Sequence, residues 1–123
     1  MKPFYTVAMA GLLFATPAAA QPVRAVDGDT LAIGTERVRV IGLDAPELHG
    51  QCPIEVALAR EARDRMAALV GRGVRLFPQG RDRYGRLLAV VLDAQGRDVA
   101  AVMIGEGLAR PYDGRGRRQG WCG

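Results

Sequence analysis

The sequence predicts a mainly β fold with helices, of the α+β class, in which five short strands form one small barrel. Short segments that are alternating or β-branched, separated by glycine-containing turns, predict the strands. One long segment repeats its apolar residues every three to four positions, which predicts a helix. The chain has 123 residues and no internal repeat, so we expect a single hydrophobic core.

The first three strands are predicted to form a meander. Residues 22–26 predict the first strand, and Asp27-Gly28 is a strong turn signal that leads into a second strand at residues 30–33. Gly34-Thr35 marks another turn. Valines alternate with arginines in residues 36–43, which predicts a third strand.

A helix is predicted at residues 54–70, with Pro53 near its start. Its apolar positions are Ile54, Leu58, Ala62, Met66 and Leu69 or Val70. The charged residues of this segment lie mostly on other faces, so we expect the apolar stripe to pack against the core. Gly71-Arg72-Gly73 ends the helix.

The remaining elements complete the pattern of a known barrel. Residues 74–77 and 86–92 predict two more strands, and we expect short helices near the C-terminus, including one at residues 98–106 capped by Asp98. Five strands interrupted by one helix after the third is the element order of an OB-fold barrel. The pattern therefore predicts that fold.

The first twenty residues have the layout of a secretory signal peptide. A lysine precedes an apolar stretch at residues 7–15, and small residues follow up to Ala20. The alternative is a membrane anchor, but this stretch is shorter than the ~20 residues that span a bilayer. We therefore expect residues 1–20 to be removed by cleavage near Ala20 and residues 21–123 to form the exported domain. The sequence does not distinguish a periplasmic location from an extracellular one.

The charge from residue 21 onward is positive, with 16 arginines against 13 acidic residues, a net charge of +3. An excess of positive charge suits a polyanionic partner. Exclusive use of arginine also has a simpler explanation in the coding composition of a genome. The net charge alone therefore does not show whether the arginines form a binding surface or reflect the base composition of the genome.

The chain has two cysteines, Cys52 and Cys122, an even number in a chain expected to be exported. An oxidising compartment favours one disulfide between them. Two cysteines and the single histidine, His49, cannot supply the four ligands of a structural zinc site. We expect His49 to be an exposed loop residue without a catalytic role.

Three acidic residues follow the ends of predicted neighbouring strands: Asp29, Asp44 and Glu47. Each alone could belong to an ordinary turn or helix cap. Together they predict a site for a hard divalent cation, because carboxylates held close together repel one another unless positive charge lies between them. Pro46 restricts Ala45 to an extended conformation, so the Ala45 main-chain carbonyl is another candidate ligand.

Arg39 and Arg86 supply the chemistry that a phosphate group requires. A guanidinium presents paired donors that match two phosphate oxygens, and it stays charged at any working pH. Two such groups beside a cation would stabilise negative charge that develops on phosphorus during attack by water. The stretch around Arg86 could also be an ordinary solvated hairpin.

Four motifs carry a family resemblance over nearly the whole segment from residue 21 onward. They are VDGDT at residues 26–30, RVRVIGLDAPE at 37–47, DRYGR at 82–86 and GLARPY at 107–112. With them the chain resembles the staphylococcal nuclease, or thermonuclease, family. The resemblance implies an OB-fold barrel and a calcium-dependent nuclease, with magnesium less expected, that cleaves DNA and RNA to 3′-phosphate and 5′-hydroxyl ends.

The resemblance also implies roles for individual residues. Asp29 and Asp44 would bind calcium directly, together with the carbonyl of Ala45, where the family usually has threonine. Glu47 would be the general base that holds the attacking water near the metal, and Arg39 and Arg86 would contact the scissile phosphate. The expected substrate-binding residues are Tyr84, Arg83 and Tyr112. For Tyr112, a structural role as a packed surface residue is an equally good interpretation.

Two other functions are compatible with the barrel. A non-catalytic OB module could hold single-stranded nucleic acid through arginine and aromatic side chains, and an exported structural domain could bind a partner protein. A binding module gains nothing from acidic residues in its groove, because they repel phosphate unless a metal is bound. The three carboxylates therefore favour the enzyme.

The C-terminus departs from the longer members of the family, which continue into a further helix. We expect a Cys52–Cys122 disulfide, with Trp121 packed on the barrel, to hold the end of this chain instead. Nothing in the sequence suggests more than a monomer.

Overall fold

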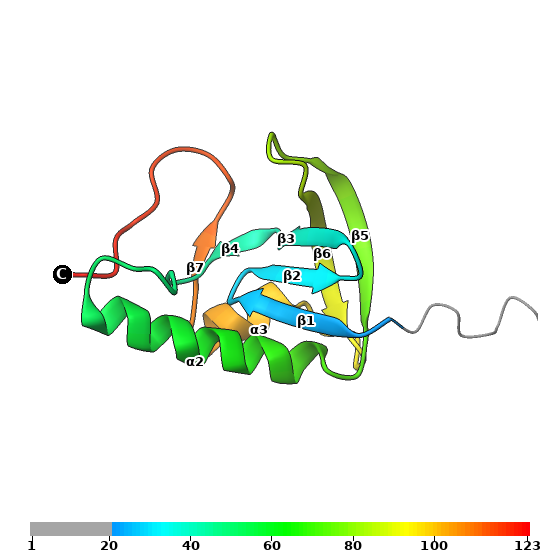
Figure 1. Cartoon of the computed structure of the whole chain (residues 1–123), viewed down its shortest axis with the longest axis horizontal. Helices are drawn as coiled ribbons and strands as arrows, with labels where there is room; N and C mark the ends of the chain where they lie inside the picture. The colour runs from blue at the N-terminus through cyan, green and yellow to red at the C-terminus, as the bar shows by residue number, and fades with distance from the viewer. Residues whose placement is uncertain (1–20) are drawn as a thin grey trace, which may run out of the picture.

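A computed structural model of the protein describes residues 21–123, so the expected signal peptide lies outside the described residues. Five strands form one mixed sheet in the order β1-β2-β3-β6-β5, and two shorter strands, β4 and β7, form a second sheet (Figure 1). The strands are β1 Val23–Asp27, β2 Thr30–Ile33, β3 Glu36–Val40, β4 Gly42–Asp44, β5 Val74–Arg81, β6 Leu87–Asp93 and β7 Arg110–Tyr112; the helices are α2 Pro53–Val70 and α3 Val99–Gly105.

The predicted fold class is confirmed. β3 pairs in parallel with β6, while the other neighbours in the five-stranded sheet are antiparallel. This arrangement, with α2 after the third and fourth strands, is consistent with an OB-fold-like α+β domain. The sheet is not closed into a full barrel, because β1 and β5 remain its two edges.

The third predicted strand is broken in the structure, which corrects its expected span of residues 36–43. β3 ends at Val40, and β4 begins at Gly42 with a φ of 104°. Glycine adopts this left-handed conformation at little cost, so the chain turns sharply here. The turn removes β4 from the large sheet and pairs Asp44 with Arg110 of β7, a strand that the sequence pattern did not reveal.

The last two strands of the large sheet also differ from their expected limits. β5 continues to Arg81, four residues beyond its predicted end, and a bulge between Pro78 and Gly80 accommodates the proline. Proline lacks the N–H of a regular ladder and is tolerated at bulges and edges. β6 begins at Leu87, one residue later than predicted.

The core lies between the sheet and the two helices. Its fully buried large side chains are Leu31, Val38, Val40, Leu43, Met66, Val70, Val91, Val99 and Met103. One part of the predicted helix face was wrong: Ile54 is 67% exposed, while Glu55 and Ala59 are buried. Glu55 turns inward because its carboxylate binds the loop before the helix, as described below, and this rotation leaves Ile54 in solvent.

The short helix near the C-terminus is confirmed. Asp98 is its N-cap, and its carboxylate accepts a hydrogen bond of 2.9 Å from the N–H of Ala100. The expectation of more than one such helix was wrong, because residues 110–123 of the described chain form β7 and an irregular C-terminal tail at residues 113–123. Among the described residues, no helix is both long enough and apolar enough to cross a membrane.

Candidate functional site

The turn between β1 and β2 places Asp29 in a buried position. The main-chain N–H of Asp29 donates to Oδ1 of Asp27 at 3.1 Å, and the Thr30 hydroxyl lies 3.4 Å from Oδ1 of Asp29. A Cβ atom on Gly28 would lie 2.7 Å from the Cβ of Ala45. Glycine is therefore required at position 28, because the turn packs directly against the chain that leaves β4.

Asp44 ends β4 and is also buried, at 5% exposure. The next residue joins it to the first turn, since the N–H of Ala45 donates to Oδ2 of Asp29 at 3.0 Å. Two of the predicted acidic residues, distant in sequence, therefore lie on adjoining segments. Burial raises the pKa of Asp44, Arg118 opposes this effect, and Asp29 adds to the rise.

The pKa of Asp27 is also affected by the neighbouring acidic residues. Its pKa is raised to about 6, mainly by burial and further by the neighbouring charges of Asp29 and Glu47. Carboxylates influence one another in this way only when they lie close together. Asp27, Asp29, Asp44 and Glu47 are therefore called the acidic cluster. Among the described residues, the carboxylate oxygens of Asp29, Asp44 and Glu47 do not all lie within 4.8 Å of one another.

Arg39 lies on β3 and extends toward this acidic cluster. Its Nη2 atom is 3.5 Å from Oδ2 of Asp29, and its Nη1 atom donates to the Val40 carbonyl at 2.6 Å. The side chain is only 14% exposed. Two contacts therefore fix the guanidinium beside Asp29.

Arg83, Tyr84 and Arg86 lie together on the hairpin between β5 and β6. Both arginines lie against the Tyr84 ring, with guanidinium carbons 5.0 Å (Arg83) and 5.7 Å (Arg86) from its centroid. Nε of Arg86 donates to Oδ2 of Asp82 at 2.7 Å. Within residues 21–123 no ion pair joins Arg86 to Asp29, Asp44 or Glu47, so this arginine lies apart from the acidic cluster.

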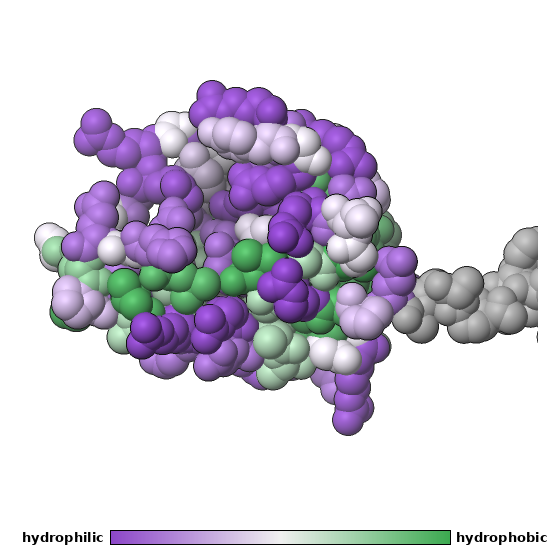
Figure 2. Space-filling model, viewed as in Figure 1, coloured by the Kyte–Doolittle hydropathy of each residue, from purple (hydrophilic) through white to green (hydrophobic). Residues whose placement is uncertain are grey.

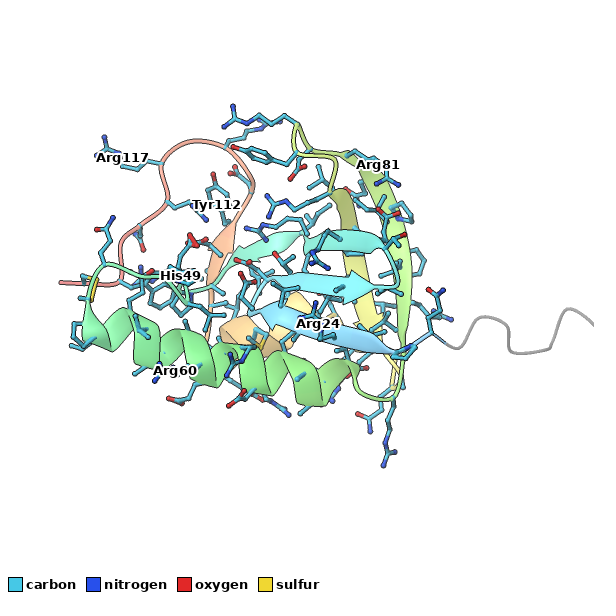
Figure 3. All side chains as sticks on the ribbon, in the orientation of Figure 1. Arg24, His49, Arg60, Arg81, Tyr112 and Arg117 are labelled. Atoms are coloured by element: carbon cyan, nitrogen blue, oxygen red, sulfur yellow. A yellow bond between two sulfur atoms is a disulfide. The ribbon has the colours of Figure 1, made fainter. Side chains whose placement is uncertain are left out.

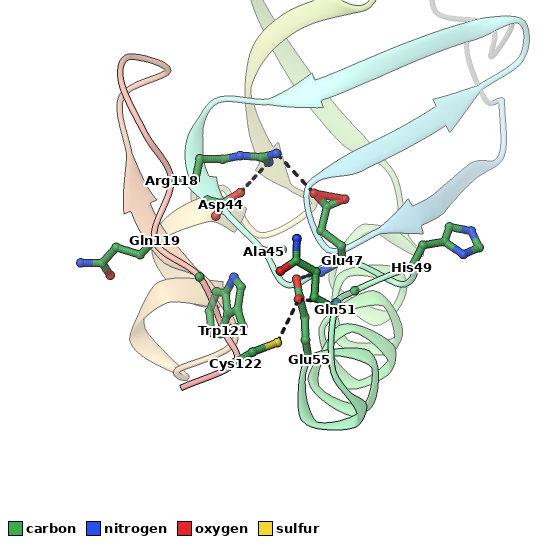
Figure 4. A pocket seen from close by; sticks show the side chains of 12 residues that line it. Asp44, Ala45, Glu47, His49, Gln51, Glu55, Arg118, Gln119, Trp121 and Cys122 are labelled. Carbon is green, nitrogen blue, oxygen red and sulfur yellow. Dashed lines mark hydrogen bonds and ion pairs between the residues drawn. The ribbon is translucent and has the colours of Figure 1, made fainter.

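Glu47 projects from the loop between β4 and α2, and its side chain is 52% exposed. Glu55 supports this loop from below: its Oε2 accepts from the N–H of Glu47 and its Oε1 from the N–H of Gln51, both at 3.0 Å. His49 in the same loop is exposed, as expected. Figure 4 shows its side chain directed away from Glu47.

The tail brings an arginine that the sequence pattern did not indicate. Nη1 of Arg118 lies 3.0 Å from Oδ1 of Asp44, and Nη2 lies 3.3 Å from Oε2 of Glu47 (Figure 4). Tyr112 also serves the tail, because its hydroxyl donates to the Gly116 carbonyl at 2.9 Å. Figure 3 shows Arg117, by contrast, pointing outward from the tail.

A pocket of about 490 Å³ separates the loop from the tail. Asp44, Ala45 and Glu47 line it, together with Arg118 and Trp121 of the tail. Hydrophilic side chains cover the upper part of the molecule above this region in Figure 2. The pocket is open and polar, which suits a charged and extended ligand better than an apolar one.

The donor set of the acidic cluster fits a hard divalent cation. Its candidate ligands, Asp29, Asp44 and the carbonyl of Ala45, are all oxygens, the donor type that calcium and magnesium bind. In the described part of the chain, the group of three ligand-type side chains within 4.8 Å of one another is Cys52, Glu55 and Cys122. That group does not offer two free thiolates, because Cys52 and Cys122 are paired with each other.

Comparison with known proteins decides the family. Residues 37–120 match the sequence model described as staphylococcal nuclease homologue, which covers more than half of the chain. The chain belongs to this family. Three of the four motifs that carried the resemblance, from RVRVIGLDAPE to GLARPY, fall within the matched range, and VDGDT at residues 26–30 precedes it.

Several curated relatives are similar to this staphylococcal nuclease homologue. It is 35% identical over 110 residues to the succinoglycan biosynthesis protein ExoI of Rhizobium meliloti (strain 1021), covering 80% of this chain and 58% of the relative. An uncharacterized endonuclease of Escherichia coli O157:H7 is 34% identical over 96 residues, with 74% of this chain and 59% of the relative covered. Endonuclease YhcR of Bacillus subtilis (strain 168) is 28% identical over 103 residues, 72% of this chain but 8% of that protein.

The first two of these relatives are longer proteins, of which the chain spans just under three fifths.

Two residues that contact the site were not predicted from the sequence. Glu55 looked like an ordinary acidic residue in the first turn of a helix, where it would interact favourably with the helix dipole. Arg118 stands in a run of arginines and glycines that has no periodicity. Only the folded path of the chain shows that Glu55 supports the Glu47 loop and that Arg118 reaches two acidic side chains.

Proposed function

We propose that this chain is a metal-dependent nuclease that hydrolyses phosphodiester bonds of DNA and RNA, with calcium as its cation. The main support is that Asp44, Ala45 and Glu47 line one open, polar pocket, and that Asp29, with Arg39 beside it, accepts the N–H of Ala45. Family membership and relatives named as endonucleases support the same class of activity. The resemblance supplies the expected products, which carry 3′-phosphate and 5′-hydroxyl ends.

The proposed roles follow from position and chemistry. Asp29, Asp44 and the carbonyl of Ala45 would hold the cation, which when bound withdraws electron density from a phosphate oxygen. Glu47 is exposed in the pocket wall, where a carboxylate can accept a proton from water. The water oxygen then bonds to phosphorus, the bond from phosphorus to the 5′ oxygen breaks, and the departing oxygen acquires a proton.

The arginines would bind the phosphate. Arg39 is held beside Asp29 and presents its remaining N–H groups to an anion next to the cation site. Arg86 would approach from the β5–β6 hairpin once substrate lies between the hairpin and the acidic cluster. Tyr84 is 69% exposed and, with Arg83, offers a surface on which a base can stack.

Tyr112 has a more limited role in this proposal. Its hydroxyl is already bonded to the tail, so any contact with substrate would use the ring.

The decisive experiment measures cleavage of single-stranded DNA, double-stranded DNA and RNA with calcium, with magnesium and with chelator. We expect calcium-dependent cleavage that chelator abolishes and that Glu47→Ser reduces by orders of magnitude. Glu61→Ser, an exposed glutamate on α2, is the matched control and should cleave like wild type. DNA binding without cleavage in any metal would overturn the proposal in favour of a non-catalytic OB module.

We also propose that the protein is exported as a monomer, cleaved near Ala20, with Cys52 and Cys122 joined as a disulfide. The distance between the two sulfurs supports the last point. Intact mass before and after alkylation of the exported protein tests both the cleavage site and the bond, and sedimentation tests the monomer. A mass that retains the first twenty residues would contradict the expected cleavage.

A further inference from the structure

Arg118 binds the same carboxylates that the proposed cation site requires. Its two Nη atoms lie 3.0 Å from Oδ1 of Asp44 and 3.3 Å from Oε2 of Glu47. Asp44 is a proposed metal ligand, and Glu47 is the proposed base. A guanidinium and a divalent cation are both positive and both need these oxygen atoms, so they compete for them.

The tail is built to hold Arg118 in this place. Upstream of it, the Tyr112 hydroxyl donates to the Gly116 carbonyl at 2.9 Å. Downstream, Nη1 of Arg110 donates to the Gly120 carbonyl at 2.6 Å, and the Arg110 guanidinium lies 3.8 Å from the centre of the Trp121 ring. Contacts on both sides therefore fix the path of the tail around Arg118.

The last anchor of the tail is covalent. Cys122 is joined to Cys52, the residue just before α2, so the tail is tied to the same loop that carries Glu47. The chain between Tyr112 and Cys122 thus forms a strap with both ends held (Figure 1), and residues 118–122 of this strap line the pocket. An arginine on this strap cannot diffuse away from the acidic cluster as a free ion would.

We propose that Arg118 is a tethered cation that competes with the divalent metal for Asp44 and Glu47, so that the tail regulates metal binding at the proposed nuclease site. The inference rests on the proposed function, because it concerns the same acidic side chains. The Arg118 side chain is 47% exposed, so a bound cation can displace it into solvent without unfolding the tail.

Calcium binding measured by titration calorimetry, without substrate, tests this proposal. Arg118→Ala should bind calcium about two- to thirtyfold more tightly than wild type, since two partly exposed ion pairs of ~0.2–1 kcal/mol each no longer oppose the metal. Arg117→Ala, the neighbouring exposed arginine that points outward, is the matched control and should bind like wild type. Equal or weaker calcium binding by Arg118→Ala would overturn the inference.

A second variant tests the tether. Cys122→Ser frees the end of the strap, so it should also tighten calcium binding, and adding Arg118→Ala to it should give little further gain. Circular dichroism of each variant checks that the fold is kept.

The outcomes separate this inference from the proposed function. Unchanged calcium affinity in Arg118→Ala, alongside calcium-dependent cleavage by wild type, would overturn the role of Arg118 alone. Absence of calcium binding by both wild type and Arg118→Ala would overturn the proposed cation and this inference together.

Discussion

Glu55 holds Glu47 in place through the main chain. One Glu55 oxygen accepts the N–H of Glu47 and the other accepts the N–H of Gln51, both at 3.0 Å. The fit is close, because a Cβ atom on Gly50 would lie 2.5 Å from Cδ of Glu55. A buried carboxylate thus sets the path of the loop from which the proposed base projects.

We predict that Glu55→Gln lowers kcat for DNA cleavage by about tenfold or more, with little change in KM. The amide replaces one acceptor with an NH₂ group that faces another N–H donor, and a hydrogen bond to a charged group contributes ~1.5–3 kcal/mol. Steady-state kinetics with calcium measures both constants. Glu61→Gln on the exposed face of α2 is the control.

A second comparison separates positioning by Glu55 from simple support of the fold. If Glu55 acts through Glu47, Glu55→Gln should have almost no further effect on kcat in a Glu47→Ser background. The same fold-loss in both backgrounds would contradict this positioning role.

Arg39→Lys should lower kcat by about a hundred- to a thousandfold, as loss of a preorganised donor to a developing negative charge does elsewhere. Lysine cannot both donate to the Val40 carbonyl and stay beside Asp29, because it lacks the planar guanidinium. The measurement is single-turnover cleavage at saturating enzyme. Arg37→Lys, an exposed position two residues earlier on β3, should remain near wild type, and an equal loss there would argue against a specific role for Arg39.

The DRYGR motif contains a turn that occurs twice in this chain. Asp82 accepts from the N–H and Nε of Arg86, and Asp93 accepts from the N–H and Nε of Arg97, at distances of 2.7–2.9 Å. The second copy, at residues 93–97, lies outside the candidate site. The ion pair within DRYGR is therefore a general way to close a tight turn, which agrees with the interpretation of that motif as an ordinary hairpin.

This repeated turn supplies a matched control for Arg86. We predict that Arg86→Ala and Arg97→Ala reduce the thermal midpoint by similar amounts, because each removes the same turn contact. Only Arg86→Ala should also reduce cleavage, by about a hundredfold or more, if its guanidinium binds the phosphate. Equal cleavage by the two variants would restrict Arg86 to a structural role.

The sequence located the candidate residues best where they lie close together in the chain. Asp29 lies in the turn before β2, and Arg39 lies on β3, which pairs with β2 so that Thr30 is opposite Arg39. Turn signals and alternation were enough to predict both of these positions. Asp44 was found by its motif, although its strand had to break at Gly42 before it could reach its position.

The roles of Arg118 and Glu55 could not be predicted from the sequence, because they depend on contacts made when the chain folds. Arg118 meets Asp44 across a separation of 74 residues, along a tail that has no regular structure. Glu55 faces inward only because the loop before α2 presents two free N–H groups to it. Neither periodicity nor turn signals encode such contacts, since they arise when the chain closes on itself.

Reduction of the Cys52–Cys122 bond should destabilise the protein by about 4 kcal/mol, because the bridge closes a loop with a sequence separation of 70. Denaturant unfolding with and without dithiothreitol measures the difference. A Cys52→Ala/Cys122→Ala variant is the control and should not respond to the reductant. An unchanged unfolding midpoint in wild type would show that the bridge does not hold the tail.

The turn at Asp93 should make stability depend on acid pH. Hydrogen bonds from the main chain of Arg97, and then from its side chain and from Gln95, hold the pKa of Asp93 below its ordinary value of 3.8 despite burial. A carboxylate with a lowered pKa in the folded state stabilises the fold above its unfolded pKa, and this contribution is lost as pH falls through the folded pKa. We therefore expect stability to fall as pH drops below about 4, and Asp93→Asn to be less stable at pH 7 but less sensitive to acid.

Unfolding free energies from pH 7 to pH 3 measure both slopes, with Asp64→Asn on the exposed face of α2 as control. Parallel curves for wild type and Asp93→Asn would show that Asp93 does not contribute to the acid sensitivity.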